Sequence, residues 1–270
     1  MKIRIIVGVT LAAVFFLALA FGGFLNFFLV TALALLSVYE MGNVMKKKGF
    51  SPFMGGAYAF AALAYAACAL YGGAGLAFCY AICAMLTMCE RFWNEKRSVG
   101  DIISSLFVTV YPLLFYAILI YVISWPDRAV GRTAMLLCFA GPLVGDTAAF
   151  FAGTLLGKHK LCPSISPNKT VEGSIAGLLG GILGGMLAWA LSPLWDFKAS
   201  FSVLAAMGLL CGLLGQAGDL FASLIKRWAQ VKDYGTVFPE HGGALDRVDS
   251  VLFCAPVGML YLLLAQAGIF

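Results

Sequence analysis

The sequence predicts an all-α, polytopic integral membrane protein with about nine transmembrane helices. Hydrophobic residues make up 62% of the 270 positions and charged residues only 11%, with a mean hydropathy of +0.94, far outside the range of soluble domains. Several charge-free stretches can cross a hydrocarbon core of roughly 30 Å as helices of roughly 20 residues. These stretches are continuously apolar, whereas the strands of a membrane barrel would alternate polar and apolar residues.

The first region, residues 1–130, is expected to hold five of these helices, which serve packing and lipid access. Two of its charge-free runs are long enough for two passes each, and a third for one pass. They are Ile5 to Tyr39 with a turn at Gly22-Gly23, Gly49 to Cys89 with a turn near Gly72 to Gly75, and Ile102 to Trp125. Glu40, near the end of the second pass, is interpreted as interfacial. An alternative for the first pass is a cleaved signal ending at Ala18-Leu19-Ala20, whose removal would leave the other loops on the same sides.

The second region, residues 131–270, is expected to hold four helices and the catalytic residues. Its single passes are Thr133 to Leu156, Ser174 to Leu194, Phe201 to Ile225 and Val248 to Gly268. Glycines in the second of these passes recur at small-xxx-small spacing, which is typical of closely packed membrane helices. Two polar loops, 157–173 and 226–247, carry most of the candidate functional residues.

The distribution of Lys and Arg predicts the orientation. Thirteen of the 18 basic residues follow the second, fourth, sixth and eighth helices, and five lie on the opposite side. The positive-inside bias therefore places both polar loops in the cytoplasm. The same bias accounts for the net charge of +5, so no nucleic-acid partner is inferred. The eight cysteines form no CxxC pair and seven lie in apolar spans, which favours packing over metal binding.

The eighth helix contains Asp219, Ser223 and Lys226 at helical spacing, so one face presents a carboxylate, a hydroxyl and an ammonium toward the cytoplasm. A structural alternative is an acid that merely pairs with a snorkelling lysine. An ionisable group inside a membrane span is costly and marks a functional site by default.

The segment HGGALDRVDS leads into the last helix and places Asp246 and Asp249 one turn apart. Asp246 alone would be explained as a helix cap. The preceding His241, Gly242 and Gly243 let the backbone approach an anion closely, and a helix N-terminus adds N–H groups, so we expect a phosphate cradle. A carboxylate beside bound phosphate suits Mg²⁺, which uses one or two carboxylates plus phosphate oxygens.

Asp146 lies about 11 residues before the end of the sixth helix, and on a regular helix it would be roughly 16 Å deep. A polar cavity is expected to reach it, and Gly141-Pro142 could break or kink the helix there. The following loop combines lysines with hydroxyls and is interpreted as a lid over a polyanion, although ordinary positive-inside charge would explain its lysines. Together these features suggest metal-assisted phosphoryl or nucleotidyl transfer between a soluble nucleotide and a lipid.

The run SLIKRWAQVKDYGTVFPEHGGALDRVD, from Ser223 to Asp249, resembles the signature of the phosphatidate cytidylyltransferases, also called CDP-diacylglycerol synthases. The segments GDTAAFFAG, GKHKL and ISPNKTVEG resemble that family's upstream block. The likeness is tight over the last 130 residues and loose elsewhere. Ala244 and Glu240 depart from the family pattern, which places fine packing rather than a charged role in question.

The resemblance implies a dimeric, nine-helix enzyme of the bacterial inner membrane that converts CTP and phosphatidate to CDP-diacylglycerol and pyrophosphate. It implies Mg²⁺ as cofactor, with a monovalent cation such as K⁺ as a further candidate. Asp219 and Asp246 are expected to ligate the metal, and Lys226 and Asp249 complete the expected catalytic set. The residues expected to bind substrate are Asp146, Lys158, Ser164, Ser166, Lys169, Thr170, Glu172, Ser223, Arg227, Lys232, Asp233, His241, Gly242, Gly243 and Arg247.

Two other functions are considered. A CTP-dependent lipid kinase of the polyprenol type would transfer the terminal phosphate of CTP instead of the cytidylyl group. An ion-coupled transporter could use Asp146 and Asp219 as ion sites, since acids in membrane spans also mark ion paths. The transporter hypothesis gives no reason for the HGG segment or the basic loops.

Overall fold

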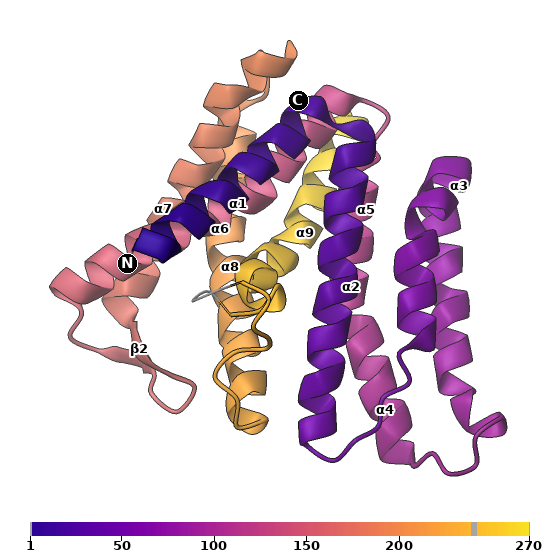
Figure 1. The fold of residues 1–270 in the computed structure, drawn as a ribbon. Coiled ribbons are helices and arrows are strands. Elements are labelled where there is room, and N and C mark those ends of the chain that lie inside the picture. The colour runs from indigo at the N-terminus through magenta and orange to yellow at the C-terminus, as the bar shows by residue number, and fades with distance from the viewer. Residues whose placement is uncertain (1, 239–241, 270) are drawn as a thin grey trace. The chain divides into compact units, whose positions relative to one another are not determined.

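The computed structural model describes residues 2–238 and 242–269 and confirms the all-α polytopic class (Figure 1). The helices are α1 (Lys2–Phe21), α2 (Gly23–Lys47), α3 (Gly55–Met88), α4 (Val99–Val108), α5 (Phe115–Ile123), α6 (Arg128–Leu156), α7 (Val171–Leu191), α8 (Phe201–Trp228) and α9 (Leu245–Gln266). Shorter elements are η1 (Glu90–Phe92), η2 (Thr109–Leu114), β1 (Lys160–Cys162), β2 (Ser166–Thr170) and η3 (Ser192–Trp195). Within the described part of the chain, seven helical segments are long and apolar enough to cross a membrane.

The chain divides into two compact units. The first comprises Met1–Ser124 and Trp228–Val248, and the second comprises Trp125–Arg227 and Asp249–Phe270. The divisions therefore fall near the end of α8 and in the first turn of α9.

In the first unit, α3 folds back on itself at Gly72, whose φ of 61° and ψ of −151° are not helical (Figure 1). A Cβ on Gly56 would lie 2.6 Å from Oγ1 of Thr87, so the two ends of α3 lie side by side. The turn predicted near Gly72 is thus confirmed. Each leg of α3 is shorter than a typical span of roughly 20 residues, and the total of nine passes stays a prediction.

The core of the first unit lies where α2 packs beside α5 (Figure 1). The hydroxyls of Ser37 and Tyr116 are 2.8 Å apart in this buried contact. The predicted single pass from Ile102 to Trp125 consists of α4, η2 and α5, because Tyr111 adopts an extended conformation before Pro112. Proline lacks a backbone N–H and crowds the preceding turn, which accounts for the interruption of the helix.

In the second unit, glycines bring α6, α7 and α8 into backbone contact. A Cβ on Gly180 of α7 would lie 2.8 Å from the carbonyl oxygen of Val144 in α6. On the α8 side, a Cβ on Gly212 would lie 3.0 Å from the carbonyl oxygen of Gly177. The packing role predicted for the α7 glycines is confirmed. Helix α6 runs unbroken through Pro142, so the expected break is wrong, while a kink at Gly141-Pro142 stays a prediction.

The loop predicted at 157–173 contains a two-stranded antiparallel hairpin, in which Lys160 pairs with Thr170 and Cys162 with Ser166. The all-α prediction did not include these two strands. The pairing is short and leads directly into α7, so its stability depends on contacts with that helix. Those contacts form part of the candidate site.

Candidate functional site

Asp219 of α8 forms an ion pair with Lys169 of β2 in the second unit. The ammonium nitrogen lies 2.5 Å from Oδ2 of Asp219, and the two side chains are 24% and 31% exposed. Asp219 was expected to be a metal ligand, or otherwise to pair with Lys226, and Lys169 was expected to bind phosphate. The hairpin brings Lys169 to the acid, so the pairing connects the lid segment to α8.

Asp146 of α6 lies near this ion pair, close enough to interact electrostatically with both Asp219 and Lys169. Its Oδ2 accepts a hydrogen bond of 3.2 Å from the Ser250 hydroxyl of α9. The side chain of Asp146 is exposed. We call Asp146, Lys169, Asp219 and Ser250 the acid–lysine cluster, in which one lysine faces two carboxylates.

Asp249 lies beside this cluster in sequence and is buried. Its Oδ1 accepts a hydrogen bond of 2.8 Å from the backbone N–H of Ser250. A Cβ on Gly218 would lie 2.6 Å from the Asp249 carbonyl oxygen, so α8 and α9 approach closely at this level. Gly218 precedes Asp219 in the sequence, and the absence of a side chain at Gly218 therefore allows α9 to pack closely against α8 beside Asp219.

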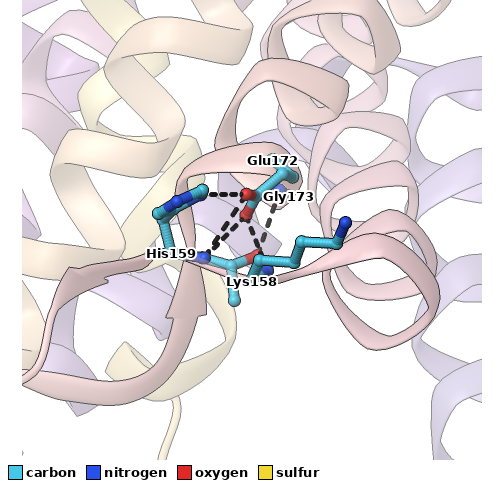
Figure 2. Close-up of polar contacts among 5 residues, drawn as sticks. Lys158, His159, Glu172 and Gly173 are labelled. Carbon is cyan, nitrogen blue, oxygen red and sulfur yellow. Dashed lines mark hydrogen bonds and ion pairs between the residues drawn. The ribbon is translucent and has the colours of Figure 1, made fainter.

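Glu172, in the first turn of α7, fastens the start of the hairpin to that helix (Figure 2). Its Oε2 accepts a hydrogen bond of 3.1 Å from the backbone N–H of Lys158, and both of its oxygens lie 3.3 Å from the backbone nitrogen of His159. Nδ1 of His159 lies 2.6 Å from Oε1, and it donates because an ionised carboxylate can only accept. Figure 2 shows the Lys158 ammonium extending away from this carboxylate.

Thr170 ends the hairpin as the N-cap of α7, and its hydroxyl accepts from the backbone N–H of Gly173 at 3.1 Å. This residue was expected to bind substrate, and the structure gives its hydroxyl a capping contact. Ser164 lies exposed in the hairpin turn and Ser166 lies in β2. Nε of Arg227 donates to the carbonyl oxygen of Ile165 at 3.3 Å, which ties the turn to the end of α8.

Asp246 is buried in the first turn of α9, in the first unit. Its Oδ2 accepts hydrogen bonds from the backbone N–H of Tyr234 at 2.7 Å and of Gly243 at 3.0 Å. Asp246 therefore closes the loop between α8 and α9 as well as being a predicted metal ligand. Gly242, with φ of 82°, adopts a left-handed conformation that favours glycine at this turn.

Glu40 of α2 was missed as a site residue. It is only 2% exposed, and its Oε1 and Oε2 accept from the backbone N–H groups of Ala244 and Leu245, at 2.9 Å each. The carboxylate of Glu40 is buried against the start of α9, and its interfacial position stays a prediction. A signal was present in the sequence, since a single acid at the end of a long charge-free run is costly unless it has a partner.

These contacts change the expected phosphate cradle. The backbone of the HGG segment and the N–H groups at the following helix start were expected to face an anion. The N–H groups of Gly243, Ala244 and Leu245 donate to the carboxylates of Asp246 and Glu40 instead. His241, the first residue of the HGG segment, lies outside the described residues. The role of Gly242 and Gly243 in substrate binding stays a prediction.

The remaining predicted residues lie after α6 (Lys158), near the end of α8 (Ser223, Lys226 and Arg227), in the following loop (Lys232 and Asp233) and in α9 (Arg247). Ser223 and Lys226 are half-buried on α8. The residues with exposed side chains are Lys158, Arg227, Lys232, Asp233 and Arg247. Of the residues described, no three His, Cys, Asp or Glu side chains form a group that could hold a metal ion. Asp219 and Asp246 belong to different units, and their joint binding of a metal stays a prediction.

Comparisons with known proteins cover nearly the whole chain. A model described as the cytidylyltransferase family matches residues 2–265. The phosphatidate cytidylyltransferase of Staphylococcus haemolyticus (strain JCSC1435) is 30% identical over 278 residues, covering 98% of this chain and 100% of that protein. The protein of that name from Staphylococcus aureus (strain COL) is 37% identical over 147 residues, covering 54% of this chain. In that comparison the matched segment spans 55% of the relative's length.

Proposed function

Because the chain belongs to the cytidylyltransferase family, we propose that it transfers the cytidylyl group of CTP to phosphatidate, giving CDP-diacylglycerol and pyrophosphate. The observation that carries this proposal is the match to the Staphylococcus haemolyticus protein, which extends over nearly all of both chains. The buried and half-buried carboxylates at the polar ends of apolar helices support it, since such groups are costly unless they serve a site.

In the proposed reaction a phosphate oxygen of phosphatidate attacks the α-phosphorus of CTP. A new P–O bond forms, the bond from the α-phosphorus to the oxygen that bridges it to the β-phosphorus breaks, and pyrophosphate leaves with that electron pair. The attacking phosphate is already ionised, so no strong general base is required. Catalysis then depends on positioning two polyanions and neutralising their charge.

Basic residues of both units suit the second requirement. Lys169 is held beside Asp219 at 2.5 Å, and Arg227 is tied to the hairpin turn. We propose that Lys169, Lys226, Arg227, Lys232, His241 and Arg247 bind the phosphates of the substrates. The Glu172 contacts keep the hairpin folded so that Lys169 stays beside Asp219 of α8.

The carboxylates fit Mg²⁺ by their chemistry, because hard cations prefer oxygen ligands. In the acid–lysine cluster, two carboxylates face one ammonium group, so the negative charge of the carboxylates exceeds the positive charge of Lys169. We propose Asp219 and Asp246 as the ligands, with Asp146 and Asp249 as further candidates and K⁺ as a second cation. When bound, Mg²⁺ would offset triphosphate charge and polarise the α-phosphorus.

We also propose that the enzyme is a homodimer in a bacterial inner membrane, with its polar loops in the cytoplasm. Support for the membrane location and the sidedness comes from the seven apolar helices among the described residues and from the bias of Lys and Arg toward these loops. This location suits the substrates, because CTP is soluble and the acyl chains of phosphatidate stay in the bilayer.

The test is to incubate the purified protein in liposomes with CTP, Mg²⁺ and phosphatidate and to measure pyrophosphate. Release that requires both phosphatidate and Mg²⁺ is expected, and a chelator should abolish it. The same release from liposomes without phosphatidate would contradict the proposal. Ion flux without any consumption of nucleotide would support a transporter instead.

A further inference from the structure

Glu40 makes a contact at the start of α9 that the proposed chemistry does not use directly. Each of its two oxygens accepts one hydrogen bond of 2.9 Å, from the backbone N–H groups of Ala244 and Leu245. The first N–H groups of a helix have no partner within the helix, so they need acceptors from elsewhere. A residue about 200 positions away in the chain supplies them.

The backbone around Glu40 leaves room for its carboxylate. A Cβ on Gly243 would lie 2.5 Å from both carboxylate oxygens, and a Cβ on Gly235 would also collide with Oε1. Any other residue at these positions would have to displace the acid or the loop. The glycine of the HGG segment that was expected to admit a phosphate thus admits the Glu40 carboxylate.

Glu40 and Asp246 together hold three successive backbone N–H groups. Gly243 donates to Asp246, while the next two residues donate to Glu40. Asp246 also receives the N–H of Tyr234, so its carboxylate is fixed from both sides of the loop. Glu40 of α2 therefore holds the first turn of α9 in place, and this fixes the direction of the Asp246 carboxylate, which belongs to the same turn.

Stability alone does not explain this arrangement. Glu40 and Asp246 are close enough to repel each other, and burial removes most of the water that would screen them. A Ser or Asn on the loop itself could cap the helix without a second buried charge. Two like charges at one helix start are better explained by a need for a rigid, strongly hydrogen-bonded turn.

We propose that Glu40 is a positioning residue, which holds the first turn of α9 so that Asp246 keeps one orientation during the reaction. This inference rests on the proposed function for its kinetic consequence, while its structural consequence can be measured without any turnover. The alternative is that Glu40 competes with a substrate phosphate for the same N–H groups. If Glu40 competed with a substrate phosphate, replacing it would lower the KM for CTP, whereas the loss of a positioning residue would not.

The test variant is Glu40→Gln, because the amide keeps the shape but offers only one acceptor oxygen for the two N–H groups. The matched control is Glu90→Gln. Glu90 lies in the same unit, is 1% exposed, and accepts from the Ser105 hydroxyl at 3.3 Å, outside the loop between α8 and α9. Glu40→Gln should lower kcat about 10- to 100-fold, as for other residues that hold catalytic ligands, and raise the Mg²⁺ concentration needed for half-maximal rate. Glu90→Gln should keep the parent's kcat.

The second readout is hydrogen–deuterium exchange of peptides that contain Ala244 and Leu245. In the parent these amides should exchange slowly although they lie in the first turn of a helix, and Glu40→Gln should speed their exchange. Fast exchange in the parent would overturn the proposal even if the variant fails to fold. Three results for Glu40→Gln would also overturn it. These are a kcat equal to that of the parent, a lower kcat with amide exchange as slow as in the parent, and a lower KM for CTP.

The readouts separate this inference from the proposed function. If the parent makes no CDP-diacylglycerol, the proposed function fails, whereas the exchange data still decide whether Glu40 holds the turn. If the parent is active and Glu40→Gln matches it, the positioning role alone fails.

Discussion

At the scale of single residues, Asp246 has two competing explanations. It is a proposed metal ligand, and it also accepts two backbone N–H groups that close the loop before α9. Both hydrogen bonds end on the same oxygen, Oδ2, and a carbonyl oxygen with two lone pairs could accept both of them. An asparagine can therefore keep the loop while removing the charge that a metal requires.

We expect Asp246→Asn to fold and extract like the parent but to lose about 100-fold or more in turnover, since Lewis-acid stabilisation is worth several kcal/mol. Its melting temperature should not fall, because the repulsion with Glu40 is removed. Thermal unfolding and rates at limiting and saturating Mg²⁺ check this. A well-folded variant with near-parental rates at limiting Mg²⁺ would remove Asp246 from the metal site.

Combining Asp246→Asn with Asp219→Asn should add little to the loss, because residues that serve one metal are strongly non-additive. The measurement is kcat for both single variants and the double variant. Losses that multiply would instead indicate two independent roles. Asp219→Asn alone also removes the ion-pair partner of Lys169 and leaves it only the more distant Asp146 carboxylate, so it should lower stability where Asp246→Asn does not.

At the scale of elements, the hairpin of β1 and β2 depends on one side chain of α7. Glu172 receives the N–H groups of Lys158 and His159 and the His159 ring, and Thr170 caps the same helix (Figure 2). These contacts fix the strand that carries Lys169. The hairpin and the start of α7 therefore behave as one folded piece.

Glu172→Gln should loosen the hairpin without unfolding the helices. We expect faster proteolysis after Lys158 and a loss of kcat/KM smaller than about tenfold, because strand pairing and the Thr170 cap remain. Limited trypsin digestion followed by mass spectrometry measures the first effect. Cleavage and kinetics that both match the parent would show that Glu172 does not hold the hairpin.

The elements differ in how well the sequence predicts them. Hydropathy and charge predict the long helices, because a membrane span needs a charge-free run of roughly 20 residues, and glycine spacing predicts the packing of α7. The hairpin was missed because SPNKT gives no alternating apolar pattern, and its stability comes from Glu172. Glu40 was missed because its partners, Ala244 and Leu245, are about 200 residues away, beyond any local pattern.

At the scale of the whole molecule, the proposed reaction requires that the polar loops lie on one side of the membrane. The proposed phosphate-binding residues must share one side of the membrane, and Lys198 must lie on the other. Lys160 and Lys198 both have exposed side chains, so each can be replaced without opening a core. Replacing Lys160 also leaves the ion pair of Lys169 intact.

We expect Lys160→Cys and Lys198→Cys, each in a background without the eight native cysteines, to react with an impermeant maleimide from opposite sides of the membrane. Lys160→Cys should label only in inside-out vesicles. Labelling of both from the same side would rule out the predicted arrangement of the helices between them.

The proposed reaction delivers the cytidylyl group of CTP, and not its terminal phosphate, to the lipid. The most direct measurement gives the purified protein phosphatidate, Mg²⁺ and CTP labelled at either the α- or the γ-phosphorus, and then extracts the lipid. The account predicts that the α label enters the lipid while the γ label stays in water as pyrophosphate. Lipid that carries the γ label and no α label would contradict it and identify a lipid kinase.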